Sequence, residues 1–275
     1  AMNVKANLEI SKLKKVSQVY VPPSPDDSSQ SMGACYAFCL INKISTKPLD
    51  NAYLGYNIDE IKVKKVLKNL PISKYKISNK NIFKKVANLL IDNKIIGLCR
   101  GNAEFGARSL GNRSIICSPN RLENIKRINE TVKNRDFWMP FAASIIDKYA
   151  VKYFKIKKSN LNNYKYMTNC VETFSNSREK LVAAIHPYDK TCRPQIITQN
   201  DNPFYYKIIE EFGKQSKIYS LLNTSLNTHG NPIINNELQA INMLKKTNLD
   251  AIVIGNYLVE KKLKQTLNDS KISVQ

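Results

Sequence analysis

The amino-acid sequence predicts an α/β to α+β domain of about 210 residues, with a short segment before it and a charged tail behind it. From about residue 50 onward, stretches with the apolar spacing of helices alternate with short apolar runs of strand length. Polar loops rich in Asn, Gly and Pro separate these stretches. With 43% hydrophobic and 24% charged residues, the composition is that of a globular protein with a buried core.

Residues 1–48, called the lead-in below, contain too few predicted elements to bury a core of their own. Residues 16–21 have the character of a strand, and residues 22–27 form a loop rich in Pro and Asp. A helix of small residues is predicted at 31–44. We therefore interpret the lead-in as the end of a larger domain.

Residues 49–258 make up the predicted domain. Helices are expected where apolar residues recur every three or four positions, and strands where short apolar runs lie between polar residues. The predicted helices lie at 58–70, 82–90, 204–212 and 237–246, and the predicted strands at 95–99, 181–185, 217–222 and 251–254. Residues 259–275 are the predicted charged tail, and within it we expect a helix at 261–275 that frays toward its end.

The net charge of +21 indicates a polyanionic ligand such as a nucleic acid, a nucleotide or phosphate, or else a general richness in Lys, Asn and Ile. The six cysteines show neither a disulfide framework nor zinc-ligand spacing, so we expect free thiols and no structural metal. No apolar stretch reaches the ~20 residues of a membrane span, and no signal peptide is visible. We therefore expect a cytoplasmic protein without a membrane partner.

The most unusual segment is residues 101–114, with the sequence GNAEFGARSLGNRS, directly after a predicted strand. Its glycines allow backbone N–H groups to approach a phosphate closely, and its two arginines supply bidentate donors. It is neither a P-loop nor a dinucleotide-binding fingerprint. The same composition fits a structural turn with surface arginines, so spacing alone leaves both interpretations open.

A second basic segment holds Lys133 and Arg135 just before the apolar residues 137–141. In a strand, these two side chains would share one face and could hold an oxyanion. The alternative is a solvated charged surface, which spacing alone favours.

Two polar segments, residues 186–195 and 222–230, also follow predicted strands. Open sheets bind ligands at strand ends, although such loops also satisfy their own backbone groups. A single histidine such as His229 is more often a structural hydrogen-bonding residue than a catalyst.

Taken in order, these segments resemble the C-terminal region of the carbamoyltransferase family that includes nodulation and antibiotic-tailoring O-carbamoyltransferases. The matching positions are Glu104-Phe-Gly106, Arg108, residues 110–115, 126–129, Lys133, Arg135, His186, Asp189, Thr191, residues 193–195, 202–203, Asn223-Thr-Ser225, Asn227, His229-Gly230 and residues 251–256. In the lead-in, residues 21–27 and 33–34 resemble the end of the family's actin-like lobe, and residues 52–55 resemble the link between lobes.

The resemblance implies a two-lobe enzyme whose C-terminal lobe has a YrdC-like, mixed and twisted sheet with flanking helices. That lobe would convert carbamoyl phosphate and ATP, with Mg²⁺, into carbamoyl-adenylate, and the carbamoyl group would then pass to an acceptor hydroxyl. The expected phosphate clamps are Arg108, Arg113, Lys133 and Arg135. The expected binding residues are Glu104, Gly106, Ser114, Asp189, Thr191, Arg193, Asn223, Thr224, Asn227 and His229.

The sequence departs from the family pattern in several places. Met139 stands where the family usually has Arg, while Ala107 and Ser109 replace a proline and an alanine. Nearly all of the actin-like lobe is missing, with its metal-binding histidine pair. Asp27, next to Asp26, resembles the family's metal-ligand aspartate, but one carboxylate cannot hold a catalytic metal, and an Asx turn or helix cap explains it equally well.

We therefore expect a transition metal only together with a partner lobe. The expected partner is an actin-like carbamoyltransferase subunit, or a second copy of this chain. Two other functions stay open. An RNA-binding module would suit the charge, but aromatic residues do not alternate with basic ones as base stacking requires. A non-catalytic interaction subunit would explain Met139, but the other motif residues are retained.

Overall fold

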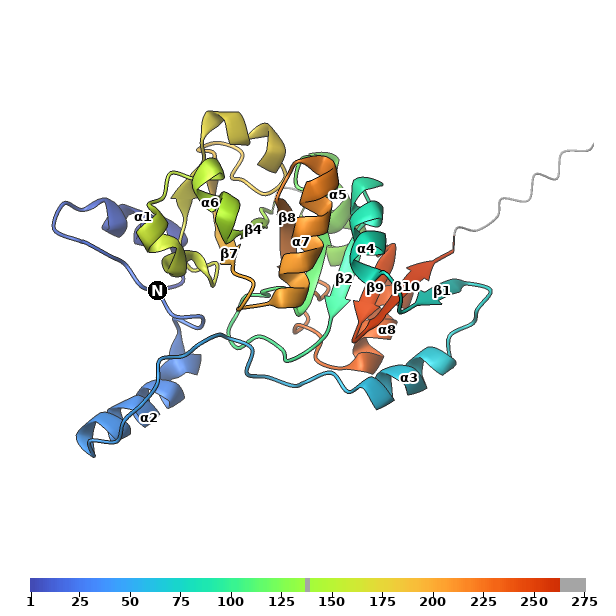
Figure 1. Cartoon of the computed structure of the whole chain (residues 1–275), viewed down its shortest axis with the longest axis horizontal. Helices are drawn as coiled ribbons and strands as arrows, with labels where there is room; N and C mark the ends of the chain where they lie inside the picture. The colour runs from blue at the N-terminus through green and yellow to red at the C-terminus, as the bar shows by residue number, and fades with distance from the viewer. Residues whose placement is uncertain (137–138, 263–275) are drawn as a thin grey trace, which may run out of the picture.

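Eight strands form one mixed sheet in the order β1-β10-β9-β2-β3-β8-β4-β7 (Figure 1). The computed structural model describes residues 1–136 and 139–262. β2 runs parallel to β9, and β4 runs parallel to β7, whereas the other neighbours are antiparallel. The strands are β1 (Tyr75–Ser78), β2 (Ile96–Cys99), β3 (Arg113–Cys117), β4 (Ala142–Ile146), β7 (Pro194–Ile197), β8 (Ser220–Ser225), β9 (Ala251–Ile254) and β10 (Tyr257–Lys261).

Helices cover both faces of this sheet, which explains why its central strands are apolar on both sides. α4 and α7 pack on one face, and α3 and α8 contribute to a second core on the other. Ile115 and Ile116 of β3 belong to these two different cores, because successive side chains of a strand point to opposite faces. The helices are α3 (Glu60–Lys68), α4 (Ile82–Ile91), α7 (Pro203–Ser216) and α8 (Glu237–Lys246).

Polar residues explain where three of these helices begin. The side chain of Asp59 accepts hydrogen bonds from two backbone N–H groups of α3. The side chain of Asn202 accepts from one backbone N–H of α7, that of Tyr205, and Asn202 is followed by Pro203, whose fixed φ suits the first helical position. Asn236 and Gln239 form a capping box at the start of α8.

Shorter elements connect the strands and build one side of the domain. A two-stranded ribbon of β5 and β6 lies beside the main sheet. The connecting elements are α5 (Glu123–Arg127), the π-helix η2 (Ile128–Lys133), α6 (Asp147–Tyr153), β5 (Val171–Glu172), β6 (Thr191–Cys192) and the 3₁₀ turns η1 (Asp27–Ser29), η3 (Lys158–Tyr164), η4 (Ser175–Ser177) and η5 (Glu179–Leu181).

The lead-in contains two helices of different character. α1 (Val4–Lys12) lies against the domain, whereas α2 (Gln30–Ile41) stands away from it, as Figure 1 shows at the lower left. The predicted helix at 31–44 is confirmed as α2. The predicted strand at 16–21 is wrong, because this segment pairs with no strand of residues 1–136 and 139–262.

A mixed sheet with flanking helices is confirmed as the fold class. The predicted helices of the domain correspond to α3, α4, α7 and α8, and the strands at 95–99, 217–222 and 251–254 correspond to β2, β8 and β9. The strand at 181–185 is wrong. Leu181, Ala183 and Ala184 are buried, but they lie in short turns. The apolar run therefore indicated correctly that these residues are buried, but it did not indicate an extended backbone.

The predicted boundary between residues 258 and 259 is also wrong. It cuts through β10, which pairs with both β1 and β9, so the domain extends at least to Lys261. The rest of the predicted tail, residues 263–275, lies outside the described residues. Within the described part of the chain, no helix has the length and apolar character needed to cross a membrane.

Candidate anion-binding site

Lys133 ends η2 and buries its side chain, which is 2% exposed. Its ammonium group donates to the backbone carbonyl of Ser225, to the Ser225 hydroxyl at 3.0 Å and to Asn227 Oδ1 at 2.6 Å. Burial, together with the nearby charge of Arg135, lowers the pKa of Lys133 to about 7. This lysine is therefore held in one position by neutral acceptors.

Arg135 lies just beyond Lys133, after a turn and not in the strand predicted for this segment. The chain turns because η2 ends there and Asn134 has a φ of 54°. The backbone N–H of Arg135 donates to Asn129 O at 2.9 Å, and its Nε donates to Asn129 Oδ1 at 2.8 Å. The guanidinium lies 5.1 Å from the ring centre of Phe141. Lys133 and Arg135 thus converge through a turn.

Arg108 and Arg193 complete a group of four cations. Burial, together with the charges of Arg108 and Arg135, lowers the pKa of Arg193 to about 10. Burial also lowers the pKa of Arg108. We call Arg108, Lys133, Arg135 and Arg193 the cation cluster.

Two members of the cation cluster have unused donors. Within residues 1–136 and 139–262, neither the Arg108 nor the Arg193 guanidinium has a hydrogen-bond partner, and Arg108 Nε is buried. No member of the cluster forms an ion pair with a carboxylate of these residues. Partly buried cations without counter-charges repel one another, and a polyanion would relieve that repulsion. The cluster is therefore suited to bind phosphate oxygens.

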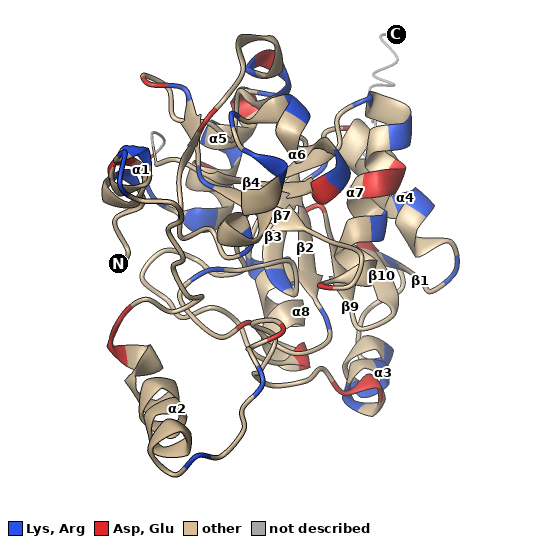
Figure 2. Cartoon of the chain, turned by 60° about the vertical axis from the view of Figure 1, so that its left-hand side comes forward, with Lys and Arg blue, Asp and Glu red and all other residues tan. Residues whose placement is uncertain are grey.

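The cluster differs from the basic residues elsewhere on the chain. Figure 2 shows Lys and Arg distributed over α1, α3, α4 and α7 as well as the centre of the domain. On α7, Lys207 and Lys214 pair with Glu210 and Glu211. Such exposed pairs are balanced and solvated, so the local lack of carboxylates, and not the net charge, marks the site.

Sequence reasoning missed two residues that hold the cluster in place. Ser225 contacts Lys133 through two oxygens, and Asn129 binds Arg135 twice. The only sequence signal was that both residues lie inside segments of the family resemblance. Asn227 was predicted as a binding residue; here its Oδ1 accepts from Lys133, and its Nδ2 donates to Asn231 O at 2.6 Å.

Arg113, which was predicted as a phosphate clamp, uses its donors inside the protein. Its side chain is 1% exposed, and Nε, Nη1 and Nη2 all donate to backbone carbonyls at 2.8–3.3 Å. The acceptors belong to Tyr56, Arg100, Gly101, Asn112 and Asn235. Through these hydrogen bonds Arg113 connects three segments of the chain, and its guanidinium has no pair of free N–H groups for a phosphate.

The other predicted residues of segment 101–114 also shape the loop. Glu104 Oε1 accepts hydrogen bonds from three backbone N–H groups, at 2.7 Å (Leu110), 2.8 Å (Asn112) and 3.1 Å (Arg113). Burial raises the pKa of Glu104, and these bonds oppose the rise. The buried Ser114 hydroxyl accepts from the N–H of Gly111 at 2.9 Å.

Gly106 has a φ of +104°, and a Cβ there would lie 2.4 Å from the carbonyl oxygen of Pro23. The structure thus explains this glycine by the close approach of the lead-in. A direct role of Glu104, Gly106 and Ser114 in ligand binding stays a prediction.

Asn223 is buried in a polar network between the loop and the sheet. Its Nδ2 donates to Ser109 O (3.1 Å), Ser144 Oγ (2.9 Å) and Gln195 Oε1 (3.1 Å). Thr224 is half-buried and lies opposite Ile115 in the ladder of β3 and β8. Their predicted roles in binding are untested by these contacts.

The segment around Asp189 lies next to Arg193 in the chain. Asp189 Oδ1 accepts from the N–H (2.9 Å) and hydroxyl (2.7 Å) of Thr191, and Lys5 forms an ion pair with Asp189 Oδ2. Although partial burial opposes it, these bonds hold the pKa of Asp189 well below its usual range. His229 is exposed, and its N–H donates to Lys133 O at 2.7 Å. Whether Asp189, Thr191 and His229 bind a ligand stays a prediction.

Asp27, the predicted metal ligand, is exposed at the start of η1, and its Oδ1 accepts from Gln30 Nε2 at 3.2 Å. The neighbouring Asp26 caps this turn through Ser28 N at 3.0 Å. Among the described residues, no group of three or more His, Cys, Asp or Glu is placed to hold a metal ion. The described residues therefore do not form a metal site by themselves, and Asp27 as one ligand of a metal shared with a partner lobe stays a prediction.

The sequence matches the model of the carbamoyltransferase C-terminus over residues 87–261. This range includes every member of the cation cluster. The chain belongs to the carbamoyltransferase family.

Curated relatives agree with this family assignment. The chain is 37% identical over 266 residues to an uncharacterized protein of Methanocaldococcus jannaschii, covering 95% of this chain and 49% of that protein. It is 30% identical over 247 residues to nodulation protein NolO of Bradyrhizobium diazoefficiens, covering 89% of this chain and 45% of NolO. The chain thus spans about half the length of these relatives.

Among solved structures, full-length HypF in its phosphate- and nucleotide-bound form is similar, with a TM-score of 0.47 and 19% identity. The similarity covers 64% of this chain and 25% of that chain. Membership of the carbamoyltransferase family therefore rests on the sequence matches and not on this structural similarity.

Proposed function

We propose that this member of the carbamoyltransferase family binds carbamoyl phosphate and ATP at the cation cluster and forms carbamoyl-adenylate, from which the carbamoyl group passes to an acceptor hydroxyl. The observation that carries the proposal is the cluster itself: four partly buried cations without a carboxylate partner in the described residues. Both substrates are polyanions, and two polyanions meet only where positive charge offsets their repulsion.

The proposed chemistry balances with one molecule of water. Carbamoyl phosphate takes up water and releases phosphate, which leaves carbamate. A carbamate oxygen then attacks the α-phosphorus of ATP, forms the new O–P bond and displaces pyrophosphate. This sequence needs no nucleophilic side chain, because positioning and charge stabilisation supply the catalysis.

The members of the cluster are suited to different tasks. Among the described residues, Arg108 and Arg193 have unpaired guanidinium donors that can form bidentate bonds with phosphate oxygens. Lys133 has a pKa of about 7, and a bound anion next to it favours the charged form. Lys133 therefore takes up a proton when a phosphate binds near neutral pH.

Magnesium has no carboxylate ligands of its own at this cluster. We propose that Mg²⁺ enters with the phosphates of ATP, as it does where a protein supplies few oxygen ligands. The protein residues then act on the phosphate oxygens that the metal leaves free.

We also propose that the chain works with a polypeptide that supplies the actin-like lobe. The supporting observation is α2, which has no buried residue although its sequence from Met32 to Ile41 contains no charged side chain. A helix that is apolar all round belongs inside a protein core. The curated relatives are about twice as long as this chain, so they contain enough additional sequence to provide such a core.

The test is carbamoyl-phosphate-dependent exchange of pyrophosphate into ATP, measured with the whole chain. We expect exchange that requires carbamoyl phosphate and falls at least about tenfold in Arg193→Gln. Arg178→Gln is the matched control, because Arg178 is exposed and lies outside the cluster; we expect a change of less than about twofold.

Two results would contradict the proposal. If the chain binds neither carbamoyl phosphate nor pyrophosphate, the cluster is not a substrate site. If both bind but no exchange occurs, the chain alone does not form carbamoyl-adenylate.

A further inference from the structure

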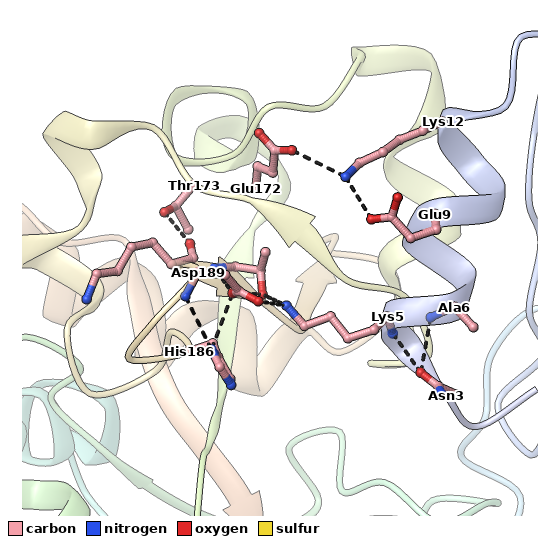
Figure 3. A network of polar contacts seen from close by, with 11 residues as sticks. Asn3, Lys5, Ala6, Glu9, Lys12, Glu172, Thr173, His186 and Asp189 are labelled. Atoms are coloured by element: carbon pink, nitrogen blue, oxygen red, sulfur yellow. Dashed lines mark hydrogen bonds and ion pairs between the residues drawn. The ribbon is translucent and has the colours of Figure 1, made fainter.

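Helix α1 of the lead-in contacts the loop that holds His186 and Asp189 (Figure 3). Lys5 reaches from α1 to form an ion pair with Asp189, and its ammonium donates to Thr191 Oγ1 at 2.6 Å. Asn7 on the same helix is 5% exposed and donates to Thr168 O at 2.8 Å. The lead-in therefore contacts the domain through specific polar groups.

Residues 186–191 form a loop that is held together by its own hydrogen bonds, so a displacement of Asp189 also displaces Thr191. Asp189 accepts from both the N–H and the hydroxyl of Thr191, and the N–H of His186 donates to Thr191 O at 2.8 Å. Thr191 is buried and belongs to β6, which ends at Cys192. Arg193 directly follows Cys192, so the position of the loop affects the position of the Arg193 backbone.

The lead-in also contacts the segment that carries Arg108. The carbonyl oxygen of Pro23 approaches Gly106 so closely that a side chain there would collide with it. In addition, the Thr168 hydroxyl donates to Val21 O at 3.1 Å. Two of the four cations are thus carried by segments that touch the lead-in.

We infer that Lys5 is a positioning residue for the anion site: through Asp189 and Thr191 it fixes the loop that places Arg193 in the cation cluster. The inference rests on the proposed function of that cluster and adds a part to it. Among the described residues the Arg193 guanidinium has no hydrogen-bond or ion-pair partner, so the course of its backbone and the packing around it set its position. A displacement near 1 Å is enough to weaken a polyanion site severely.

The test is the affinity for pyrophosphate, measured by titration calorimetry at low salt with the whole chain. We expect Lys5→Met to weaken binding about fivefold or more, and Lys5→Arg to restore it to within about twofold, because arginine keeps the charge and the donors. Lys12→Met is the charge-matched control. Lys12 lies on the same helix with similar exposure and pairs with Glu9 and with Glu172, which lies opposite Thr191 in the ladder of β5 and β6. Lys12 forms no ion pair with Asp189 in the described residues, so this control isolates the Asp189 contact.

A second measurement separates positioning from a general loss of structure. If Lys5 acts through Asp189, the double variant Lys5→Met with Asp189→Asn binds pyrophosphate no more weakly than the weaker single variant. Additive losses would show that the two residues act separately and would overturn the inference.

The outcomes distinguish this inference from the proposed function. If the unaltered chain does not bind pyrophosphate, the anion site itself fails. If the unaltered chain binds and Lys5→Met binds equally well, the site stands and the positioning role fails. Tighter binding by Lys5→Met would also overturn the inference, because Lys5 would then be blocking Asp189 and Thr191 from a ligand.

Discussion

Lys133 and Asn227 are joined by a hydrogen bond of 2.6 Å from the ammonium Nζ to the amide Oδ1. Asn227 follows β8, whereas Lys133 ends η2, so this bond connects two segments that are distant in sequence at one end of the sheet. The acceptor is neutral. It orients the ammonium without cancelling its charge, and that charge stays available to an anion.

The first prediction concerns the pH dependence of stability. In the unfolded chain Lys133 has a pKa of about 10.4, but in the folded protein its pKa is about 7. Between these values the unfolded chain binds a proton that the folded protein does not, so the free energy of unfolding rises with pH above about 7. Lys133→Met should lack this contribution.

Urea unfolding at pH 7 and pH 9 measures the difference. We expect the free energy of unfolding to increase with pH by about 1–2 kcal/mol more in the unaltered protein than in Lys133→Met. The exposed Lys126 provides the control, and Lys126→Met should behave like the unaltered protein. Identical pH dependence in all three proteins would contradict the lowered pKa.

The second prediction separates structural from binding arginines in segment 101–114. Arg113 donates to backbone carbonyls through all its nitrogens, and lysine has fewer donors and no planar fork. Arg113→Lys should therefore lower the free energy of unfolding by about 3 kcal/mol, since buried carbonyls lose their partners.

Affinity for pyrophosphate is the second measurement on this variant, made at a temperature where it is still folded. We expect Arg113→Lys to bind pyrophosphate within about threefold of the unaltered protein, because Arg113 has no free donor for the anion. Arg108→Lys is the comparison: it should unfold normally and bind more weakly. A loss of affinity in Arg113→Lys that equals the loss in Arg108→Lys would contradict this division.

The third prediction concerns the docking role of α2. Phe38 is 62% exposed and Leu40 is 80% exposed, so charges at these positions should change the free energy of unfolding by less than about 0.5 kcal/mol. Phe38→Glu combined with Leu40→Glu should nevertheless abolish co-purification with a co-expressed actin-like lobe, because docking of that lobe would bury the two new carboxylates.

The control for this prediction is Ile72→Glu, at an apolar residue of the domain that is 81% exposed. We expect Ile72→Glu to co-purify normally and Phe38→Glu with Leu40→Glu to fail. If the unaltered chain stays monomeric and ignores the co-expressed lobe, the proposed partner is wrong. Concentration-dependent self-association through α2 would point instead to a second copy of the chain.

Several elements could be predicted because local pattern alone decides them. α8 was predicted at 237–246 and β9 at 251–254, and both have these bounds. Each carries its own signal, a capping residue with helical apolar spacing or a short apolar run of β-branched residues. β1 and β10 carry weaker signals, because β1 is an edge strand and both strands are only partly buried.

The turn between Lys133 and Arg135 could not be predicted from spacing. Two cations separated by one residue suggest a strand, yet a π-helix and a left-handed Asn134 bring the two side chains together. The π-helix is rare, and its hydrogen bonds depend on contacts outside the segment, such as those of Asn129 with Arg135.

The sequence by itself determined the family, the alternation of helices and strands and the residue types of the anion site. Only the tertiary structure decided which basic residues use their donors inside the protein and which keep them free among the described residues. Arg108 and Arg113 share one glycine-rich segment, but Arg113 enters β3 opposite Cys99 and is surrounded by backbone carbonyls, whereas Arg108 stays in the loop beside Arg193. A side chain's partners depend on the register of strands that are distant in sequence, and local spacing does not contain that register.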